Sequence, residues 1–134
     1  MSEARFIERQ GEVSRAAARL RQGVTQPETE LIRDAVIQRF EFTFELVWKS
    51  LKLYLERQGH ECGGPRPTFK KAFAEGLILS ADAADGWLRM LDDRNLASHA
   101  YDEVLAARIY LNIVREYTPL LSAMAEKIQT LNWN

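Results

Sequence analysis

The sequence predicts an all-α protein, an up-and-down four-helix bundle with one short additional helix. Apolar residues recur every three or four positions over long stretches, and no segment shows the strict alternation that is typical of strands. Gly and Pro gather at a few points that separate these stretches. The chain has 134 residues, 46 % of them hydrophobic. This length suits one filled core and not two ordinary domains, so we expect residues 1–134 to form a single domain.

Residues 3–21 predict the first helix. Its apolar stripe contains Phe6, Val13, Ala17 and Leu20. The arginines of this segment fall largely on another face: Arg5, Arg9, Arg15 and Arg19. Residues 22–27 (QGVTQP) end the helix, and Pro27 suits the first turn of the next one. No Gly or Pro interrupts residues 28–58, which predict a helix about 45 Å long.

The predicted second helix carries more apolar surface than one buried face needs. Its main stripe contains Ile32, Val36, Phe40, Phe44, Val47, Leu51 and Tyr54. Further apolar positions extend around the helix, namely Phe42, Leu46, Trp48, Leu53 and Leu55. Such a helix is either central in the bundle or buried by a second subunit. We expect a two-fold homodimer, and we interpret the aromatic cluster as core rather than as a surface for stacking nucleic-acid bases.

Residues 59–67 (GHECGGPRP) form a loop by composition, with Gly59 ending the long helix. Pro67 should open a short helix that Gly76 ends. Ser80 is a suitable cap for a further helix over residues 81–94.

The apolar spacing of residues 102–131 predicts the last long helix. Pro119 should kink it, because the proline ring removes one backbone donor and crowds the carbonyl of Arg115.

Composition excludes several classes of protein. The net charge of −1 and the pI near 6.1 exclude a protein that coats nucleic acid by charge alone. No apolar run approaches the roughly 18 residues of a membrane-spanning helix. Cys62 is the only cysteine, so no internal disulfide forms and a cytoplasmic location is expected. His60 and Cys62 lack a second pair of ligand-type residues nearby, so we predict no metal site and no cofactor.

Residues 91–103 (LDDRNLASHAYDE) concentrate ionisable groups between the last two predicted helices. Arg94 and His99 form a pair suited to attack on a phosphodiester, because a guanidinium grips phosphate oxygens and an imidazole exchanges protons near neutral pH. The spacing alone is not specific, since arginine is frequent in this chain. The alternative is that Asp92, Asp93 and Arg94 are a solvated helix end and that His99 is a capping or core histidine.

Three blocks of sequence resemble the HEPN superfamily and, within it, the HepT branch, whose members are also described as nucleotidyltransferase substrate-binding proteins. These blocks are residues 33–56 (RDAVIQRFEFTFELVWKSLKLYLE), 65–78 (PRPTFKKAFAEGLI) and 87–103 (WLRMLDDRNLASHAYDE). The last block contains the string Arg94-x4-His99-x-Tyr101 just before the final long helix. The likeness extends over about residues 4–117.

The resemblance implies a toxin-type ribonuclease that needs no metal. Its active site would be composite, built where two protomers bring Arg94 and His99 together across a two-fold axis. Arg94 would bind the scissile phosphate of the RNA substrate, and His99 would be the general base or acid for attack by the 2′-hydroxyl. Asn95 would orient the phosphate or the imidazole ring.

The resemblance also implies a partner, a small nucleotidyltransferase that acts as the antitoxin and transfers AMP from ATP to Tyr101. The adduct would block and repel RNA. Two other roles stay open: a non-catalytic subunit that presents a substrate to a separate nucleotidyltransferase, and a helical dimer with a decayed site. Basic residues for further RNA contact also stay open, either the arginines of residues 3–21 or the group Arg66, Lys70 and Lys71.

Overall fold

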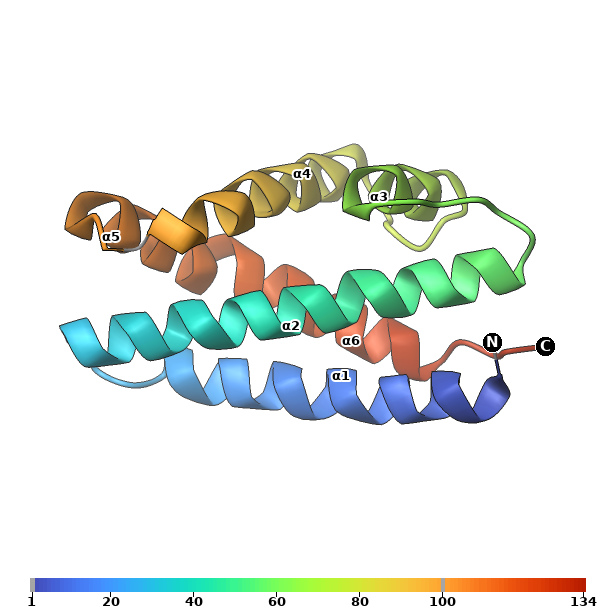
Figure 1. Ribbon diagram of the computed structural model, residues 1–134, viewed down its shortest axis with the longest axis horizontal. Coiled ribbons are helices and arrows are strands. Elements are labelled where there is room, and N and C mark those ends of the chain that lie inside the picture. The colour runs from blue at the N-terminus through green and yellow to red at the C-terminus, as the bar shows by residue number, and fades with distance from the viewer. Residues whose placement is uncertain (1, 100) are drawn as a thin grey trace.

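A computed structural model describes residues 2–99 and 101–134, and within them the chain is helical without a strand, as the sequence predicted. The α-helices are α1 (Glu3–Val24), α2 (Glu30–Arg57), α3 (Pro65–Ala74), α4 (Ala81–Leu96), α5 (Glu103–Asn112) and α6 (Thr118–Gln129). A 3₁₀ turn, η1 (Ala97–His99), follows α4, and a π-helical segment, η2 (Ile113–Tyr117), joins α5 to α6. The helices form a bundle in which α1 and α2 run antiparallel (Figure 1).

Helix α2 is the centre of the bundle and contacts α1, α3, α5 and α6. Three of its additional apolar side chains are therefore buried within the chain itself, namely Leu46, Leu53 and Leu55. Trp48 is partly buried, whereas Phe42 is 63 % exposed, so the interpretation of the aromatic cluster as core is wrong for Phe42. The central position of α2 thus accounts for most of the apolar excess without a second subunit, and the homodimer stays a prediction.

Two helix starts differ from the sequence-based expectation by two residues. Helix α2 begins at Glu30 because Thr29 caps it, its side chain accepting a hydrogen bond from the Ile32 amide at 3.1 Å. Helix α3 begins at Pro65 rather than Pro67, with Gly64 as its cap residue. The predicted Ser80 cap is confirmed, since its hydroxyl accepts from the Ala83 amide at 3.1 Å.

The irregularity expected at Pro119 takes the form of the π-helical segment η2, which lies directly before the first turn of α6. A proline inside a regular helix would leave one carbonyl without its donor and press against the carbonyl four residues earlier. The wider π turn relieves this crowding while the chain stays helical. The last predicted helix is therefore observed as α5, η2 and α6 in succession.

The main core lies between α2 and the surrounding helices and includes Phe40, Phe44, Phe69 and Trp87. A smaller cluster of Phe6, Leu53 and Trp133 joins the two chain ends, which lie at the same end of the molecule (Figure 1). Over residues 2–99 and 101–134, none of the helices combines the length and the apolar character needed to cross a membrane.

Candidate active site

The junction between α4 and α5 is a tight connection built by Asp102. The Asp102 amide donates to the His99 carbonyl at 3.0 Å. Its carboxylate accepts from the amides of Val104 and Leu105 at 3.0 and 3.1 Å and so caps the first turn of α5. His99 and Tyr101 are thereby presented on a short turn rather than on a helix face.

The structure brings His99 and Tyr101 together. The Tyr101 hydroxyl lies 3.5 Å from His99 Nδ1, at the outer limit of a hydrogen bond. The two rings meet edge to face, with centroids 6.0 Å apart. His99 is exposed and Tyr101 is 82 % exposed. Both groups are therefore open to a ligand or a partner, and His99 is neither a buried core histidine nor a helix cap.

Arg94 lies in the last turn of α4 and binds a carboxylate on α2. Its Nη2 donates to Glu45 Oε2 at 2.9 Å, and Trp48 Nε1 donates to the same oxygen at 3.1 Å. Lys49 Nζ is 3.1 Å from the other oxygen of Glu45. Burial alone would raise the pKa of Glu45, but the hydrogen bonds from Lys49 and Trp48 and the charge of Arg94 lower it. Glu45 is therefore an ionised anchor for Arg94.

The guanidinium of Arg94 keeps capacity for a further ligand. Its side chain is 36 % exposed, and its Nε is buried with no hydrogen-bond partner among the described residues. Burial raises the pKa of the nearby Glu41, and the charge of Arg94 opposes that rise. No hydrogen bond or ion pair within the described part of the chain joins Arg94 to His99. The reason is that Arg94 is directed to α2, whereas His99 follows the end of α4.

Asn95, the supporting residue suggested by the resemblance, is exposed in the last turn of α4. Among the hydrogen bonds of residues 2–99 and 101–134, none involves its side chain. Its position beside Arg94 leaves it accessible to a ligand.

Asp93 is a residue whose role the sequence reasoning missed. Its side chain is buried rather than part of a solvated helix end, and it is the central acceptor of a polar cluster. The Tyr117 hydroxyl donates to Asp93 Oδ2 at 2.6 Å, Asn112 Nδ2 donates to the same atom at 2.9 Å, and Arg108 Nη2 is 3.1 Å from Oδ1. The position offered a signal, because residue 93 falls between Met90 and Ala97 on the buried face of α4.

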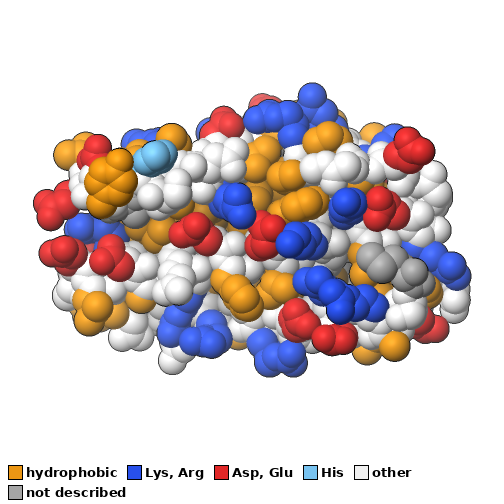
Figure 2. Space-filling model, in the orientation of Figure 1, with side chains coloured by type: hydrophobic (Ala, Val, Ile, Leu, Met, Phe, Trp, Pro, Cys, Tyr) orange, Lys and Arg blue, Asp and Glu red, His pale blue; other side chains and the backbone are white. Residues whose placement is uncertain are grey.

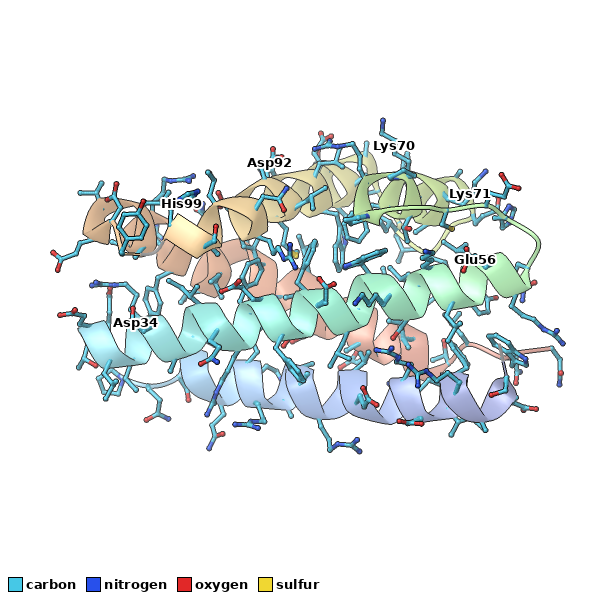
Figure 3. All side chains as sticks on the ribbon, viewed as in Figure 1. Asp34, Glu56, Lys70, Lys71, Asp92 and His99 are labelled. Atoms are coloured by element: carbon cyan, nitrogen blue, oxygen red, sulfur yellow. The ribbon has the colours of Figure 1, made fainter. Side chains whose placement is uncertain are left out.

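A shallow groove of about 270 Å³ runs from Tyr101 to the first half of α2. The carboxylates of Asp34 and Glu41 line it together with Tyr101. Figure 3 places Asp34 and His99 at the same end of the molecule. Among the described residues that line this groove, Tyr101 is the one aromatic residue, and the others are acidic, polar or aliphatic.

The first histidine has a different setting. His60 Nε2 lies 2.9 Å from Glu75 Oε1, and Cys62 is buried in the core. Within the described ranges, no group of three or more His, Cys, Asp and Glu side chains is arranged to hold a metal ion.

Comparison with known protein families shows to which family the chain belongs. A family model described as "Nucleotidyltransferase substrate binding protein like" matches residues 8–130. The chain belongs to this family. The match covers the three blocks that suggested the resemblance and continues to the end of α6.

Two further proteins are similar to this chain, one in sequence and one in structure. "Probable ribonuclease HepT" of Haemophilus influenzae (strain ATCC 51907 / DSM 11121 / KW20 / Rd) is 33 % identical over 82 residues, 58 % of this chain and 54 % of that protein. The alignment thus spans about half the length of this curated relative. A crystal structure of a protein from Thermus thermophilus matches with a TM-score of 0.80 and 35 % identity, covering 87 % of this chain and 98 % of that one. The helical bundle is therefore shared with a relative of known structure.

Proposed function

We propose that this protein is an endoribonuclease toxin of the HepT type, which cleaves RNA by proton transfer and charge stabilisation without a metal ion. The observation that carries the proposal is the exposed imidazole of His99 beside the exposed phenol of Tyr101, at 3.5 Å. Membership in the substrate-binding-protein-like family and a curated relative named a probable ribonuclease support it.

The proposed reaction uses the RNA's own 2′-hydroxyl as nucleophile. His99 accepts the proton of this hydroxyl, whose oxygen then attacks the adjacent phosphorus. The bond from phosphorus to the 5′-oxygen of the next nucleotide breaks, that oxygen takes a proton from water as it leaves, and His99 returns its own proton to the solvent. The products are a 2′,3′-cyclic phosphate and a 5′-hydroxyl. Arg94 binds the non-bridging oxygens and stabilises their developing charge, and Asn95 orients the phosphate.

The site is proposed to be composite. Arg94 is held by Glu45 on α2 and makes no contact with His99 of its own chain among the described residues. Two-fold association would pair Arg94 of one protomer with His99 of another. The proposal therefore requires a homodimer.

Tyr101 is proposed as the control point. Its hydroxyl would attack the α-phosphorus of ATP held by a partner nucleotidyltransferase, with loss of the phenolic proton and release of pyrophosphate. The resulting phosphodiester places bulk and negative charge beside His99, so RNA phosphate would be repelled and the toxin neutralised. The 82 % exposure of Tyr101 is what such an enzyme needs in order to reach it.

RNA cleavage by the purified protein tests the ribonuclease role. Protein with its unmodified intact mass should cleave RNA in the presence of a metal chelator, and His99→Ala should lower the rate by at least about 100-fold. His60→Ala is the matched control and should keep activity, because His60 pairs with Glu75 away from the junction. Failure of the unmodified protein to cleave RNA contradicts the proposal.

The second candidate is a non-catalytic subunit that presents a substrate to a nucleotidyltransferase, and the description of the family favours it. Incubation with the partner enzyme and ATP separates the two functions. Adenylate found on this chain, and lost in Tyr101→Phe, supports the regulated toxin. Adenylate found only on a third molecule supports the substrate-binding role.

A further inference from the structure

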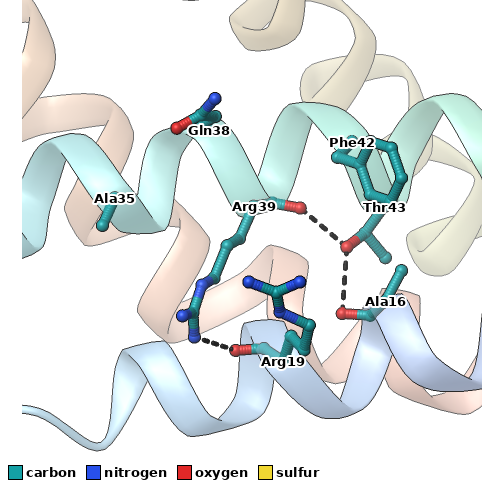
Figure 4. A pocket seen from close by; sticks show the side chains of 7 residues that line it. All are labelled: Ala16, Arg19, Ala35, Gln38, Arg39, Phe42 and Thr43. Atoms are coloured by element: carbon teal, nitrogen blue, oxygen red, sulfur yellow. Dashed lines mark hydrogen bonds between the residues drawn. The ribbon is translucent and has the colours of Figure 1, made fainter.

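Two grooves lie along the boundary between α1 and α2. The larger one, about 370 Å³, is lined by Arg19 and Arg39 and by the exposed Phe42 (Figure 4). The smaller one, about 200 Å³, lies between the first half of α1 and the second half of α2. Because the two helices are antiparallel, the grooves follow one another along the same boundary. We call the two together the α1/α2 groove.

The lining of the α1/α2 groove is strongly cationic in a protein whose net charge is −1. It contains six basic side chains, Arg5, Arg9, Arg19, Arg39, Lys49 and Lys52. Glu56 is the one acidic residue among the lining residues of the two grooves. Figure 2 shows Lys and Arg side chains over α1 and α2, with acidic side chains among them. A local excess of this kind attracts a polyanion.

Most of these cations are available. No ion pair within 4.0 Å involves Arg5, Arg9, Arg19 or Lys52 among the described residues. Arg39 uses one nitrogen to bind the Arg19 carbonyl at 2.8 Å, which fixes the position of its guanidinium (Figure 4).

Aromatic side chains accompany the cations. Phe42 lines the larger groove and Trp48 the smaller one. Cations that follow a backbone, together with aromatic faces on which bases stack, are the features that bind single-stranded nucleic acid. A small anion would need only one of the two grooves, and an apolar ligand would not need the charge.

The α1/α2 groove is connected to the candidate active site through one carboxylate. Glu45 binds Arg94 on one side, and on the other it contacts Trp48 and Lys49, both of which line the smaller groove. By helical register Glu12 and Glu45 lie between the two grooves, so the positive lining is divided there into two segments. A strand leaving Arg94 would enter the smaller groove first.

We propose that the α1/α2 groove is a binding track for single-stranded RNA. Phosphates of the strand next to the cleaved bond lie on Arg5, Arg9 and Lys52, and its bases stack on Trp48 and Phe42. The inference deepens the proposed ribonuclease function, since it names the surface that holds the substrate outside the reacting groups.

Binding can be measured separately from cleavage in the His99→Ala background. A fluorescently labelled single-stranded RNA oligonucleotide is titrated with this protein and with the same protein carrying Arg9→Glu and Lys52→Glu. Neither side chain takes part in a hydrogen bond among the described residues, and circular dichroism confirms folding. We expect the affinity to fall at least about ten-fold. The slope of log affinity against log salt should fall by about 1.4, the value for two lost phosphate contacts on a single strand.

Lys70→Glu with Lys71→Glu is the matched control, because it makes the same change in charge on α3, on the other side of α2 from α1 (Figure 3). Its affinity should stay within about two-fold. Phe42→Ala should weaken binding about ten-fold with an unchanged salt slope, since it removes stacking and no charge.

Equal losses in the two charge-reversed pairs, or a loss only in the α3 pair, would overturn the track. The track would also be overturned if the Arg9→Glu/Lys52→Glu protein bound RNA normally but no longer associated with the partner nucleotidyltransferase. The groove would then be a protein interface. Failure of the native protein to cleave RNA rejects the ribonuclease function alone, because the binding experiment uses protein without His99.

Discussion

At the scale of single residues, the buried carboxylate of Asp93 ties the end of α4 to the last helical stretch. It accepts hydrogen bonds from Tyr117 and Asn112 and pairs with Arg108. Asp93→Ala should lower the free energy of unfolding by about 3 kcal/mol, because it leaves three polar partners without their acceptor. Urea denaturation measures this change.

Asp92→Ala is the control for that measurement. The Asp92 side chain is 66 % exposed, and among the described residues it pairs only with the exposed Arg66. Its removal should change the stability by no more than about 0.5 kcal/mol. Equal effects of the two substitutions would contradict a central role for Asp93.

Tyr117 makes the free energy of unfolding depend on pH in the alkaline range. Burial, the hydrogen bond to Asp93 and the charge of Asp93 raise the pKa of this phenol well above its ordinary value of about 10. The unfolded chain therefore loses its proton at a lower pH than the folded chain does. The contribution to stability is complete below about pH 10 and falls as the pH rises further. Denaturation of the native protein and of Tyr117→Phe between pH 8 and about 11 checks this, since only the native protein should show this component of the decline.

At the scale of elements, Asp102 sets where α5 begins and so fixes the turn that presents Tyr101. Asp102→Ala removes the acceptor of two backbone amides and should cost about 1 kcal/mol of stability. Asp102→Asn should cost much less, because asparagine is an equally good cap. Hydrogen exchange at the amides of Val104 and Leu105 should accelerate in the alanine variant only.

The helices were predictable because their signals are local. These signals act within a few residues of the chain: the apolar spacing, Gly59 with its positive φ of 96°, and the Ser80 cap. The sequence therefore placed most helices to within a few positions. The π-helical form of the break before Pro119 was not predictable. The sequence shows that Pro119 lacks a backbone N–H donor. Whether the helix kinks or widens there depends on the packing around it, which the sequence does not show.

At the scale of the whole molecule, the candidate site was only half predictable. His99 and Tyr101 are two residues apart on one turn, so their proximity follows from the sequence. Arg94 meets Glu45, 49 residues earlier in the chain, and no local pattern identifies that partner. The single domain and the homodimer concern the assembled protein and stay predictions.

The proposed composite site makes a prediction about mixed dimers. Arg94→Ala and His99→Ala proteins should each be inactive alone, yet refolding them together should restore measurable RNA cleavage. In a mixed dimer, the intact arginine of one chain meets the intact histidine of the other. Light scattering on the same samples should give twice the chain mass.

A mixture of Arg94→Ala protein with the Arg94→Ala/His99→Ala double variant controls for refolding and should stay inactive. If the mixture of Arg94→Ala and His99→Ala proteins forms dimers but recovers no RNA cleavage, Arg94 and His99 of the same chain must act together.

Because Trp48 lies beside Glu45, its fluorescence can report on the state of the Arg94–Glu45 pair. Its indole shares one carboxylate oxygen with Arg94, whereas the other two tryptophans, Trp87 and Trp133, are 2 % and 7 % exposed and lie in the apolar clusters. A phosphate that draws Arg94 away from Glu45 changes the charge next to the Trp48 ring and so shifts its emission. Inorganic phosphate brings no base that could stack on Trp48, so with this ligand the intrinsic fluorescence of unlabelled protein can follow occupancy of the arginine in real time, with Trp48→Phe as the blank.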